Sequence, residues 1–219
     1  MGALLIDYIL RSRKELGKMP ANPAIIRSIV TSPFGDYICK KYGVKMIECL
    51  TGFKWIAAVE ANFEKDNSAS YVFGLEESYG YKVETEVMDK DGVSAAAMCA
   101  EMILYWRSQG KSLLEHLDDL YKEFGYFEDR AISQNFPGAS GSETMKAMMS
   151  SMRANPPKSL GGEKVVKVRD CLADPELPKS NVLQFYLESG TIVSARPSEK
   201  KKKIKFYINS MIPAGDGSD

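Results

Sequence analysis

The chain has 219 residues, which is enough to bury a sizeable core in one or two domains. Its hydrophobic share of 44% and charged share of 26% are those of an ordinary globular protein, and no run approaches the roughly 20 apolar residues of a membrane span. Lys plus Arg and Asp plus Glu number 29 each, so no global field favours nucleic acid or an acidic membrane, and any anion site must be local.

The first part of the chain alternates between helical and strand-like patterns. Apolar residues recur at helical spacing over residues 3–9, and Gly17 ends that helix. The segments that follow are predicted as a strand at 24–30, a helix at 33–42 ended by Gly43, a strand at 44–50 and a helix at 51–63. Strands that alternate with helices indicate βαβ units and a largely parallel sheet.

The rest of the chain changes character near residues 124–126. Before this point two helices are predicted, the first with one apolar face of Val93, Ala96, Ala97, Ala100, Ile103 and Leu104, and the second with Leu113, Leu114, Leu117 and Leu120. After it, strands become prominent, at 126–134, 164–168, 182–187, 191–195 and 204–208, with one helix at 142–153 and a hairpin turn at 188–190. We therefore predict a βαβ-type α/β domain with a mixed sheet at 1–124 and a smaller α+β domain at 125–219.

The cysteines and the lone histidine exclude a structural zinc site of the usual kinds. Cys39, Cys49, Cys99 and Cys171 are widely separated, form no Cys-x-x-Cys pair, and are accompanied by a single histidine, His116. We expect reduced, mostly buried thiols in a cytoplasmic protein, since the amino terminus shows no basic segment followed by an apolar stretch. His116 lies in a leucine-rich helix, which predicts a surface or boundary position.

Residues 74–81 carry the strongest chemical signal, because Gly-Leu-Glu-Glu-Ser-Tyr-Gly-Tyr directly follows an apolar run at 71–73. Carboxylates accept hydrogen bonds from sugar hydroxyls, Ser78 can donate as well as accept, and the glycines permit backbone conformations that bring these groups to a substrate. The run predicts a buried strand, and open α/β sheets bind ligands at the carboxyl ends of their strands. The segment thus indicates a sugar-binding loop, although a solvated acidic loop would read the same way.

Two further segments make the signal specific. Residues 51–55 read Thr-Gly-Phe-Lys-Trp, and residues 90–92 read Lys-Asp-Gly. In this order the three segments closely resemble the third domain of the α-D-phosphohexomutases, and the resemblance runs from Gly2 to about Tyr207. The sugar loop, Glu-Glu-Ser-Tyr-Gly, is most similar to that of the phosphoglucomutase and phosphopentomutase branch.

The chain lacks two motifs of a full four-domain enzyme. It contains neither the phosphorylated serine segment Thr-Ala-Ser-His-Asn-Pro nor the metal loop Asp-x-Asp-x-Asp-Arg. The resemblance therefore implies the carboxyl-terminal half, domains three and four. Because residues 213–219 are a short polar tail, we expect the fourth domain to be incomplete, with an exposed sheet face or edge.

The resemblance also implies roles for residues of the first domain. Glu76 and Ser78 would bind the sugar hydroxyls, and Glu77 would orient the loop. Thr51 and Gly52, at a strand-to-helix turn, and Lys90 would add contacts to the sugar or its phosphate. Simpler readings stand beside these, since Thr51 can be an ordinary helix cap and Lys90 an ordinary exposed lysine.

A phosphate contact is implied in the second domain. Arg196 and Ser198 follow a predicted strand and match the start of the family's phosphate loop, Arg-Pro-Ser-Gly-Thr-Glu-Pro-Lys. Arginine can hold a phosphate through two hydrogen bonds, and serine adds a donor. Here Glu199 and residues 200–203, all lysine, follow instead, so the glycine and threonine are lost and a diffuse positive field replaces a shaped loop. A solvated charge run is the simpler reading.

Taken together, the resemblance implies a parent enzyme that interconverts sugar 1-phosphate and 6-phosphate, or pentose 1- and 5-phosphate, with a phosphoserine, Mg²⁺ and a sugar bisphosphate activator. This chain would recognise small-molecule sugar phosphates, hold no catalytic residue, metal or cofactor by itself, be inactive alone, and need the amino-terminal half of the enzyme as its partner. The alternatives are a stand-alone, non-catalytic sugar-phosphate binding module and a nucleotide-dependent transferase. For the transferase the sequence offers neither a Walker loop nor a Gly-x-Gly-x-x-Gly turn.

Overall fold

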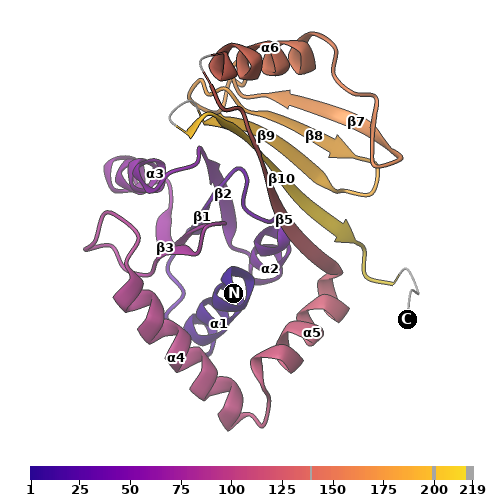
Figure 1. Ribbon diagram of the computed structural model, residues 1–219. Coiled ribbons are helices and arrows are strands. Elements are labelled where there is room, and N and C mark those ends of the chain that lie inside the picture. The colour runs from indigo at the N-terminus through magenta and orange to yellow at the C-terminus, as the bar shows by residue number, and fades with distance from the viewer. Residues whose placement is uncertain (139, 199–200, 216–219) are drawn as a thin grey trace. The chain divides into compact units, whose positions relative to one another are not determined.

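The computed structural model describes residues 1–138, 140–198 and 201–215. The chain divides into two compact units, Met1–Gly125 and Tyr126–Asp219 (Figure 1). Among the helices of the described ranges, none combines the length and apolar character that a membrane crossing requires.

The first unit is a mixed four-stranded sheet with helices on both faces. Its elements in chain order are α1 (Gly2–Glu15), β1 (Pro23–Ser28), α2 (Phe34–Tyr42), β2 (Lys45–Cys49), α3 (Phe53–Asp66), β3 (Ser70–Glu76), β4 (Gly80–Lys82), α4 (Gly92–Ser108) and α5 (Leu113–Phe124). The strand order is β2-β1-β3-β4, in which β1 pairs in parallel with β2 and β3, whereas β4 runs antiparallel to β3. The predicted βαβ arrangement is confirmed.

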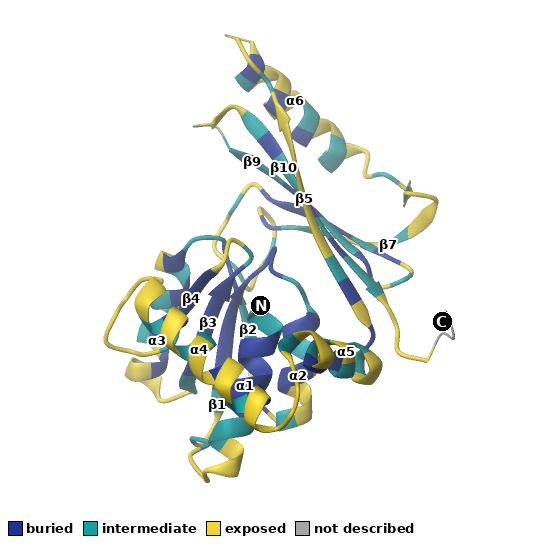
Figure 2. Cartoon of the chain, turned by 60° about the horizontal axis from the view of Figure 1, so that its bottom comes forward, coloured by how far each residue is buried: buried dark blue, intermediate teal, exposed yellow. Residues whose placement is uncertain are grey.

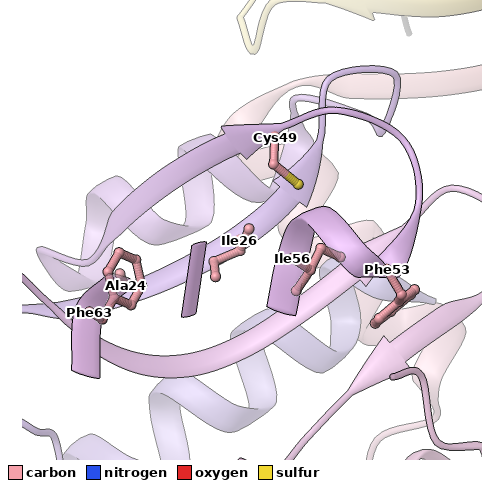
Figure 3. Packing of buried hydrophobic residues seen from close by; sticks show 6 residues of the cluster. All are labelled: Ala24, Ile26, Cys49, Phe53, Ile56 and Phe63. Carbon is pink, nitrogen blue, oxygen red and sulfur yellow. The ribbon is translucent and has the colours of Figure 1, made fainter. Parts of the chain in front are cut away.

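Helix α3 packs on one face of this sheet through an apolar cluster (Figure 3). The cluster consists of Ala24, Ile26, Cys49, Phe53, Ile56 and Phe63. On β1 the neighbouring Ile25 is also fully buried, on the opposite face, which explains why a central parallel strand reads as a continuous apolar run. Figure 2 shows the resulting buried centre of the sheet in dark blue.

The glycines that flank the predicted sugar loop have a different role from the one expected. Neither Gly74 nor Gly80 has a positive φ, and the residue that does is Tyr79, with φ 59°. A Cβ on Gly74 would lie 2.8 Å from Ile56, and one on Gly80 would lie 2.6 Å from the Phe53 ring. These glycines are therefore required because α3 packs closely against the hairpin, and not because the backbone needs their conformational freedom.

The apolar face predicted for α4 is not the face that the unit buries. Val93 and Leu104 are 81% and 68% exposed, whereas Ala95, Met102 and Trp106 are buried. The helix is apolar nearly all round, so its periodicity could not indicate which side packs. The sequence-based assignment of its buried face is wrong for this reason.

The prediction of a surface or boundary position for His116 is also wrong, because His116 on α5 is only 3% exposed. Its Nε2 lies 2.9 Å from Oδ2 of the buried Asp7, and the ring stacks on Trp106 at 3.5 Å between centroids. The Tyr42 hydroxyl donates to Oδ1 of Asp7 at 2.9 Å, and Arg11 adds a weaker contact at 3.4 Å. One carboxylate thus joins α1, α2 and α5, and no local sequence pattern could reveal a partner 109 residues away.

The second unit is an antiparallel sheet of order β5-β10-β9-β8-β7-β6 with one helix on it. Its elements are β5 (Tyr126–Asn135), α6 (Gly141–Ala154), β6 (Ser159–Leu160), β7 (Glu163–Asp170), β8 (Leu183–Leu187), β9 (Ile192–Ser198) and β10 (Lys203–Ile212). Helix α6 places Met145 and Met149 on Leu183, Phe185, Ala195 and Ile204 of the sheet. The other side carries alternate polar residues, including Gln184, whose Nε2 donates to Ser194 at 3.0 Å.

The cysteines are free thiols, and the predicted glycine turns are present. Three cysteines are buried, Cys99 is half-buried, and all four are free. Gly43 ends α2 in the left-handed conformation, and Gly190 takes a positive φ in the hairpin between β8 and β9. β5 lies at one edge of its sheet and exposes most of its side chains.

Replacing Asp7 with Asn should lower the free energy of unfolding at pH 7 by about 3 kcal/mol, because His116 and Arg11 lose their buried carboxylate. Burial raises the pKa of Asp7, but the His116 hydrogen bond and the Arg11 charge outweigh it and hold the pKa below its usual 3.8. The stabilisation is therefore present above that value and lost as the pH falls through the lower folded pKa.

Urea unfolding at pH 7 and at pH 3 checks this expectation, with Asp119→Asn as control, since Asp119 forms an exposed ion pair with Lys111. The control should leave stability nearly unchanged. A gap between wild type and Asp7→Asn that is as large at pH 3 as at pH 7 would contradict the assignment.

Gly80→Ala should destabilise the first unit by about 1–3 kcal/mol, because the added methyl group meets the Phe53 ring. Gly92→Ala is the matched control, since its Cβ meets nothing within 4 Å. Thermal unfolding of both variants makes the comparison, and equal melting temperatures would show that the close approach at Gly80 is unimportant.

Candidate functional site

Three parallel strands of the first unit end side by side at one edge of the sheet. β1 ends at Ser28, β2 at Cys49 and β3 at Glu76, with registers that place Ser28 beside Cys49 and Arg27 beside Leu75. The segments that follow these ends carry hydroxyl and carboxylate side chains. In open α/β sheets this edge is where ligands bind, so we call it the rim and define it by residues 28–32, 51–52 and 76–79.

Glu76 is the last residue of β3 and is 9% exposed. Its Oε1 accepts a hydrogen bond from the backbone N–H of Gly52, which is the N-cap of α3. Gly52 adopts φ 118° and ψ 129°, a conformation that side-chain-bearing residues rarely take, so the turn that aims this N–H requires glycine. The carboxylate thus lies at the N-terminus of α3, where the helix dipole attracts negative charge.

Thr51 does not cap α3, because the helix begins at Phe53 with Gly52 as its cap. This corrects the expectation that the helix opens at Thr51. The Thr51 Oγ1 is buried and has no hydrogen-bond partner among the described residues. A hydroxyl in this condition lacks the hydrogen bond that burial normally demands.

The turn after Glu76 is short, since β4 resumes at Gly80. Oε2 of Glu77 accepts a hydrogen bond from the Ser28 hydroxyl at 3.0 Å, and Ser28 also lies 2.9 Å from the Thr31 hydroxyl. Glu77 is therefore tied to the end of β1, while Ser78 is exposed at the tip. Ser28 and Thr31 were not among the residues singled out from the sequence, where nothing distinguishes them from ordinary loop hydroxyls.

Arg27 organises the end of β1 from within the sheet, where it is 4% exposed. Its guanidinium donates to both oxygens of Asp36 on α2, at 2.8 and 2.7 Å, and lies 2.9 Å from Glu48 on β2. Nη1 donates to the carbonyls of Ser28 and Thr31, at 3.3 and 3.1 Å. Five donors in a planar fork suit this task, and the arginine fixes the loop that holds Ser28 against Glu77.

Lys90 approaches the rim from the segment before α4. Its Nζ lies 5.7 Å from the Phe53 ring centroid and 3.1 Å from Asp89, and its side chain is 58% exposed. Its Cδ lies 3.4 Å from the position of a Cβ on Gly80. The next residue, Asp91, caps α4 by accepting from the N–H groups of Val93 and Ser94. Of the first-unit residues singled out, Glu76 and Gly52 are directly bonded and Lys90 contacts the same hairpin.

In the second unit Arg196 and Ser198 lie within β9 and not after it, which corrects their predicted location. Ala195 packs against α6, and successive side chains of a strand point to opposite faces. Arg196 and Ser198 therefore lie on the side of the sheet away from α6. Arg196 pairs in register with Lys205 and donates to the Tyr207 hydroxyl at 3.4 Å. Glu199 and Lys200 lie outside the described residues.

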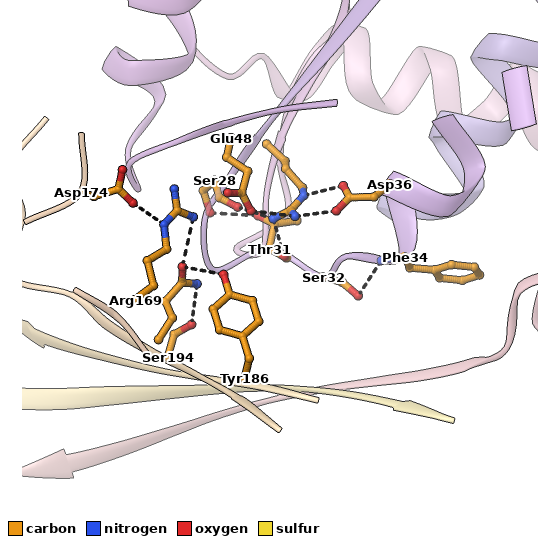
Figure 4. A network of polar contacts seen from close by, with 12 residues as sticks. Ser28, Thr31, Ser32, Phe34, Asp36, Glu48, Arg169, Asp174, Tyr186 and Ser194 are labelled. Atoms are coloured by element: carbon orange, nitrogen blue, oxygen red, sulfur yellow. Dashed lines mark hydrogen bonds and ion pairs between the residues drawn. The ribbon is translucent and has the colours of Figure 1, made fainter. Parts of the chain in front are cut away.

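Further polar contacts line the same side of this sheet. Arg169 on β7 is paired with Asp174 and donates to Oε1 of Gln184 at 3.4 Å (Figure 4). Lys167 lies over the Tyr186 ring at 5.0 Å. The side thus combines arginine, lysine and tyrosine, a composition suited to anions.

A divalent metal does not fit the residues that the structure describes. No group of three His, Cys, Asp or Glu side chains in these ranges could hold an ion. At the rim, Glu76 and Glu77 each already accept a hydrogen bond from another segment. Mg²⁺ favours several oxygen ligands in octahedral geometry, which this arrangement does not supply.

Comparison with known proteins agrees with the fold. Residues 1–124, more than half of the chain, match the family described as phosphoglucomutase/phosphomannomutase, alpha/beta/alpha domain III. The chain is 32% identical over 221 residues to a phosphoglucomutase of Staphylococcus haemolyticus, covering 95% of this chain and 39% of that protein. It is 31% identical over 228 residues to a phosphoglucomutase of Staphylococcus aureus, covering 99% and 40%.

Two solved structures share the fold. Paramecium pp63/parafusin, a phosphoglucomutase in its open form, gives a TM-score of 0.70 at 18% identity over 99% of this chain and 38% of that one. A phosphomannomutase-like protein of Thermus thermophilus gives 0.59 at 16% identity, covering 96% and 36%. The chain spans about two-fifths of the relatives it matches. It belongs to the phosphoglucomutase/phosphomannomutase family, the α-D-phosphohexomutases, and corresponds to a carboxyl-terminal portion comprising the third and fourth domain folds.

Proposed function

We propose that this chain is the substrate-recognising portion of a phosphoglucomutase-type enzyme that interconverts sugar 1-phosphate and 6-phosphate, or pentose 1- and 5-phosphate. The observation that carries the proposal is the bond between Gly52 and Glu76, which assembles two of the three family segments at one rim. Recognition takes place in the cytoplasm in this account. In this account the rim binds the ring hydroxyls of either sugar.

The rim residues suit hydroxyl recognition in complementary ways. Ser78 is exposed and can both donate and accept, while Glu76 offers a carboxylate held in place by the N-terminus of α3. Thr51, next to Gly52 in the sequence, has a buried Oγ1 with no partner in the described part of the chain. Lys90 adds a positive charge for a phosphate or sugar oxygen. A site built to pair with hydroxyls discriminates against analogues that lack them, because its own polar groups would stay unpaired.

In the second unit, Arg196 and Ser198 would bind a phosphate group. Their neighbours Lys203 and Lys205 are their register partners on β10 and strengthen the positive potential. Arginine with a hydroxyl donor beside it gives directional hydrogen bonds to a phosphate, and the lysines add non-directional electrostatic attraction.

The transfer chemistry would come from polypeptide outside this chain. Mg²⁺, bound elsewhere in the enzyme, would neutralise charge on the transferring phosphoryl group, and a phosphoserine with a sugar bisphosphate activator would carry that group. The residues described here bind and orient the sugar. We therefore expect this chain alone to be inactive and to need an amino-terminal portion of the enzyme as its partner.

Ser78→Ala should weaken the binding of glucose 6-phosphate about tenfold, or about 1.4 kcal/mol, without changing the melting temperature, because it removes an exposed hydroxyl contact. Glu76→Gln should weaken binding at least as much while keeping an acceptor for Gly52. Calorimetry measures both affinities, and Ser68→Ala, an exposed serine before β3, serves as control. Unchanged affinity in both rim variants would exclude the hydroxyl-binding role.

Mixing this chain with the amino-terminal three-fifths of the Staphylococcus haemolyticus phosphoglucomutase should produce mutase activity that neither piece has alone. The same mixture with Arg196→Ala should lose most of that activity through a higher KM, since a phosphate contact is removed. If this chain binds sugar phosphate but the mixture shows no mutase activity, the stand-alone, non-catalytic module is favoured instead.

A further inference from the structure

A lysine and a glutamate lie buried together beneath the rim hairpin. Nζ of Lys82, the last residue of β4, donates to Oε1 of Glu60 on α3 at 2.7 Å, and both side chains are 1% exposed. Charged side chains are almost never buried so fully unless they are paired, and pairing does not cancel the cost of removing both from water.

The ammonium group is held from several directions. It also donates to the carbonyl of Glu84 at 2.6 Å and lies 4.4 Å from the ring centroid of Tyr71 on β3. The Tyr71 hydroxyl in turn donates to the carbonyl of Lys82 at 2.7 Å. Lys82 is thus fixed through its side chain and its backbone, against a helix, a strand and the following segment.

The pair is not arranged for maximal stability. Oε2 of Glu60 is buried without a hydrogen-bond partner among the described residues, and burial raises the pKa of Glu60 against the lowering effect of Lys82. Buried ion pairs of this kind often stabilise a fold no more than apolar side chains of similar volume would. Such a pair then mainly fixes the positions of the two side chains, because each buried charge is stable only beside its partner.

The geometry at stake is that of the hairpin formed by β3 and β4. β4 has only three residues and lies at the edge of its sheet, so its backbone bonds alone hold it weakly. Helix α3 holds the hairpin at two points, Gly52 against Glu76 and Glu60 against Lys82. Eight residues along a helix separate these points by about 12 Å, so α3 braces the hairpin along its length.

We propose that Lys82 and Glu60 are a positioning pair that fixes the hairpin, and with it Glu76 and Ser78, for ligand recognition. The consequence for the ligand rests on the proposed function of the rim, whereas the consequence for the hairpin does not. Neither residue needs to touch the substrate, since both act through the strand that carries the turn.

The test replaces both partners, Lys82→Met with Glu60→Leu, so that no unpaired charge remains. The double variant should keep the melting temperature of the wild type within a few degrees or raise it. Amide hydrogen exchange over residues 75–82 should become at least tenfold faster, while exchange in β1 stays the same. The affinity for glucose 6-phosphate should fall about tenfold, with rescue expected from Lys82→Arg, which keeps a charge beside Glu60.

The control applies the same two substitutions to an exposed pair, Lys41→Met with Glu123→Leu, whose charged atoms lie 2.8 Å apart on α2 and α5. It should leave both exchange and affinity unchanged. Unchanged exchange over residues 75–82 in the buried double variant would overturn the proposal, as would unfolding or uniformly faster exchange, which would show a purely structural pair. Faster hairpin exchange with no sugar-phosphate binding even by wild type would support the positioning role and refute the function proposed for the rim.

Discussion

The hydrogen bond from the Gly52 N–H to the Glu76 carboxylate is the contact on which the arrangement of the rim depends. It joins the β2–α3 turn to the end of β3, two segments that are 24 residues apart. No local sequence pattern indicates that they are in contact. Two requirements converge there. Gly52 must adopt a conformation that favours glycine, and the Glu76 carboxylate must lie at the N-terminus of α3 to accept its N–H.

Buried charges hold the rest of the first unit in a similar way. Arg27 fixes the loop after β1, Lys82 fixes β4, and Asp7 joins the helices on the other side of the sheet. Each of these charges is buried and hydrogen-bonded to partners from other elements. Each therefore fixes the relative position of those elements more sharply than apolar packing does. The apolar cluster around α3 supplies the bulk of the burial, and the charges determine where the functional segments lie.

The sequence predicted those features that local residues determine. Alternating strands and helices indicated the βαβ arrangement, Gly43 marked the end of α2, and the apolar residues from Val93 onward indicated α4. The predictions failed where the outcome depends on distant partners. Nothing in the sequence near His116 indicates that it will be buried in contact with Asp7.

The candidate site follows the same division. The three family segments identified Glu76, Gly52 and Lys90, and these lie around one hairpin. The roles of Arg27 and Lys82 could not be predicted, because a single charge in an apolar strand reads as an exposed side chain until its partner is known. The end of β9 was missed because Pro197 within it indicates a loop, although the strand continues to Ser198.

The most direct test of the central claim is to map the binding surface by amide chemical shifts, titrating the labelled chain with glucose 6-phosphate and, separately, with inorganic phosphate. The account predicts that the sugar phosphate shifts the amides of Gly52, Ser78 and Lys90, and that inorganic phosphate leaves the Ser78 amide unmoved. Shifts confined to other parts of the first unit, or none at saturating sugar phosphate, would contradict it.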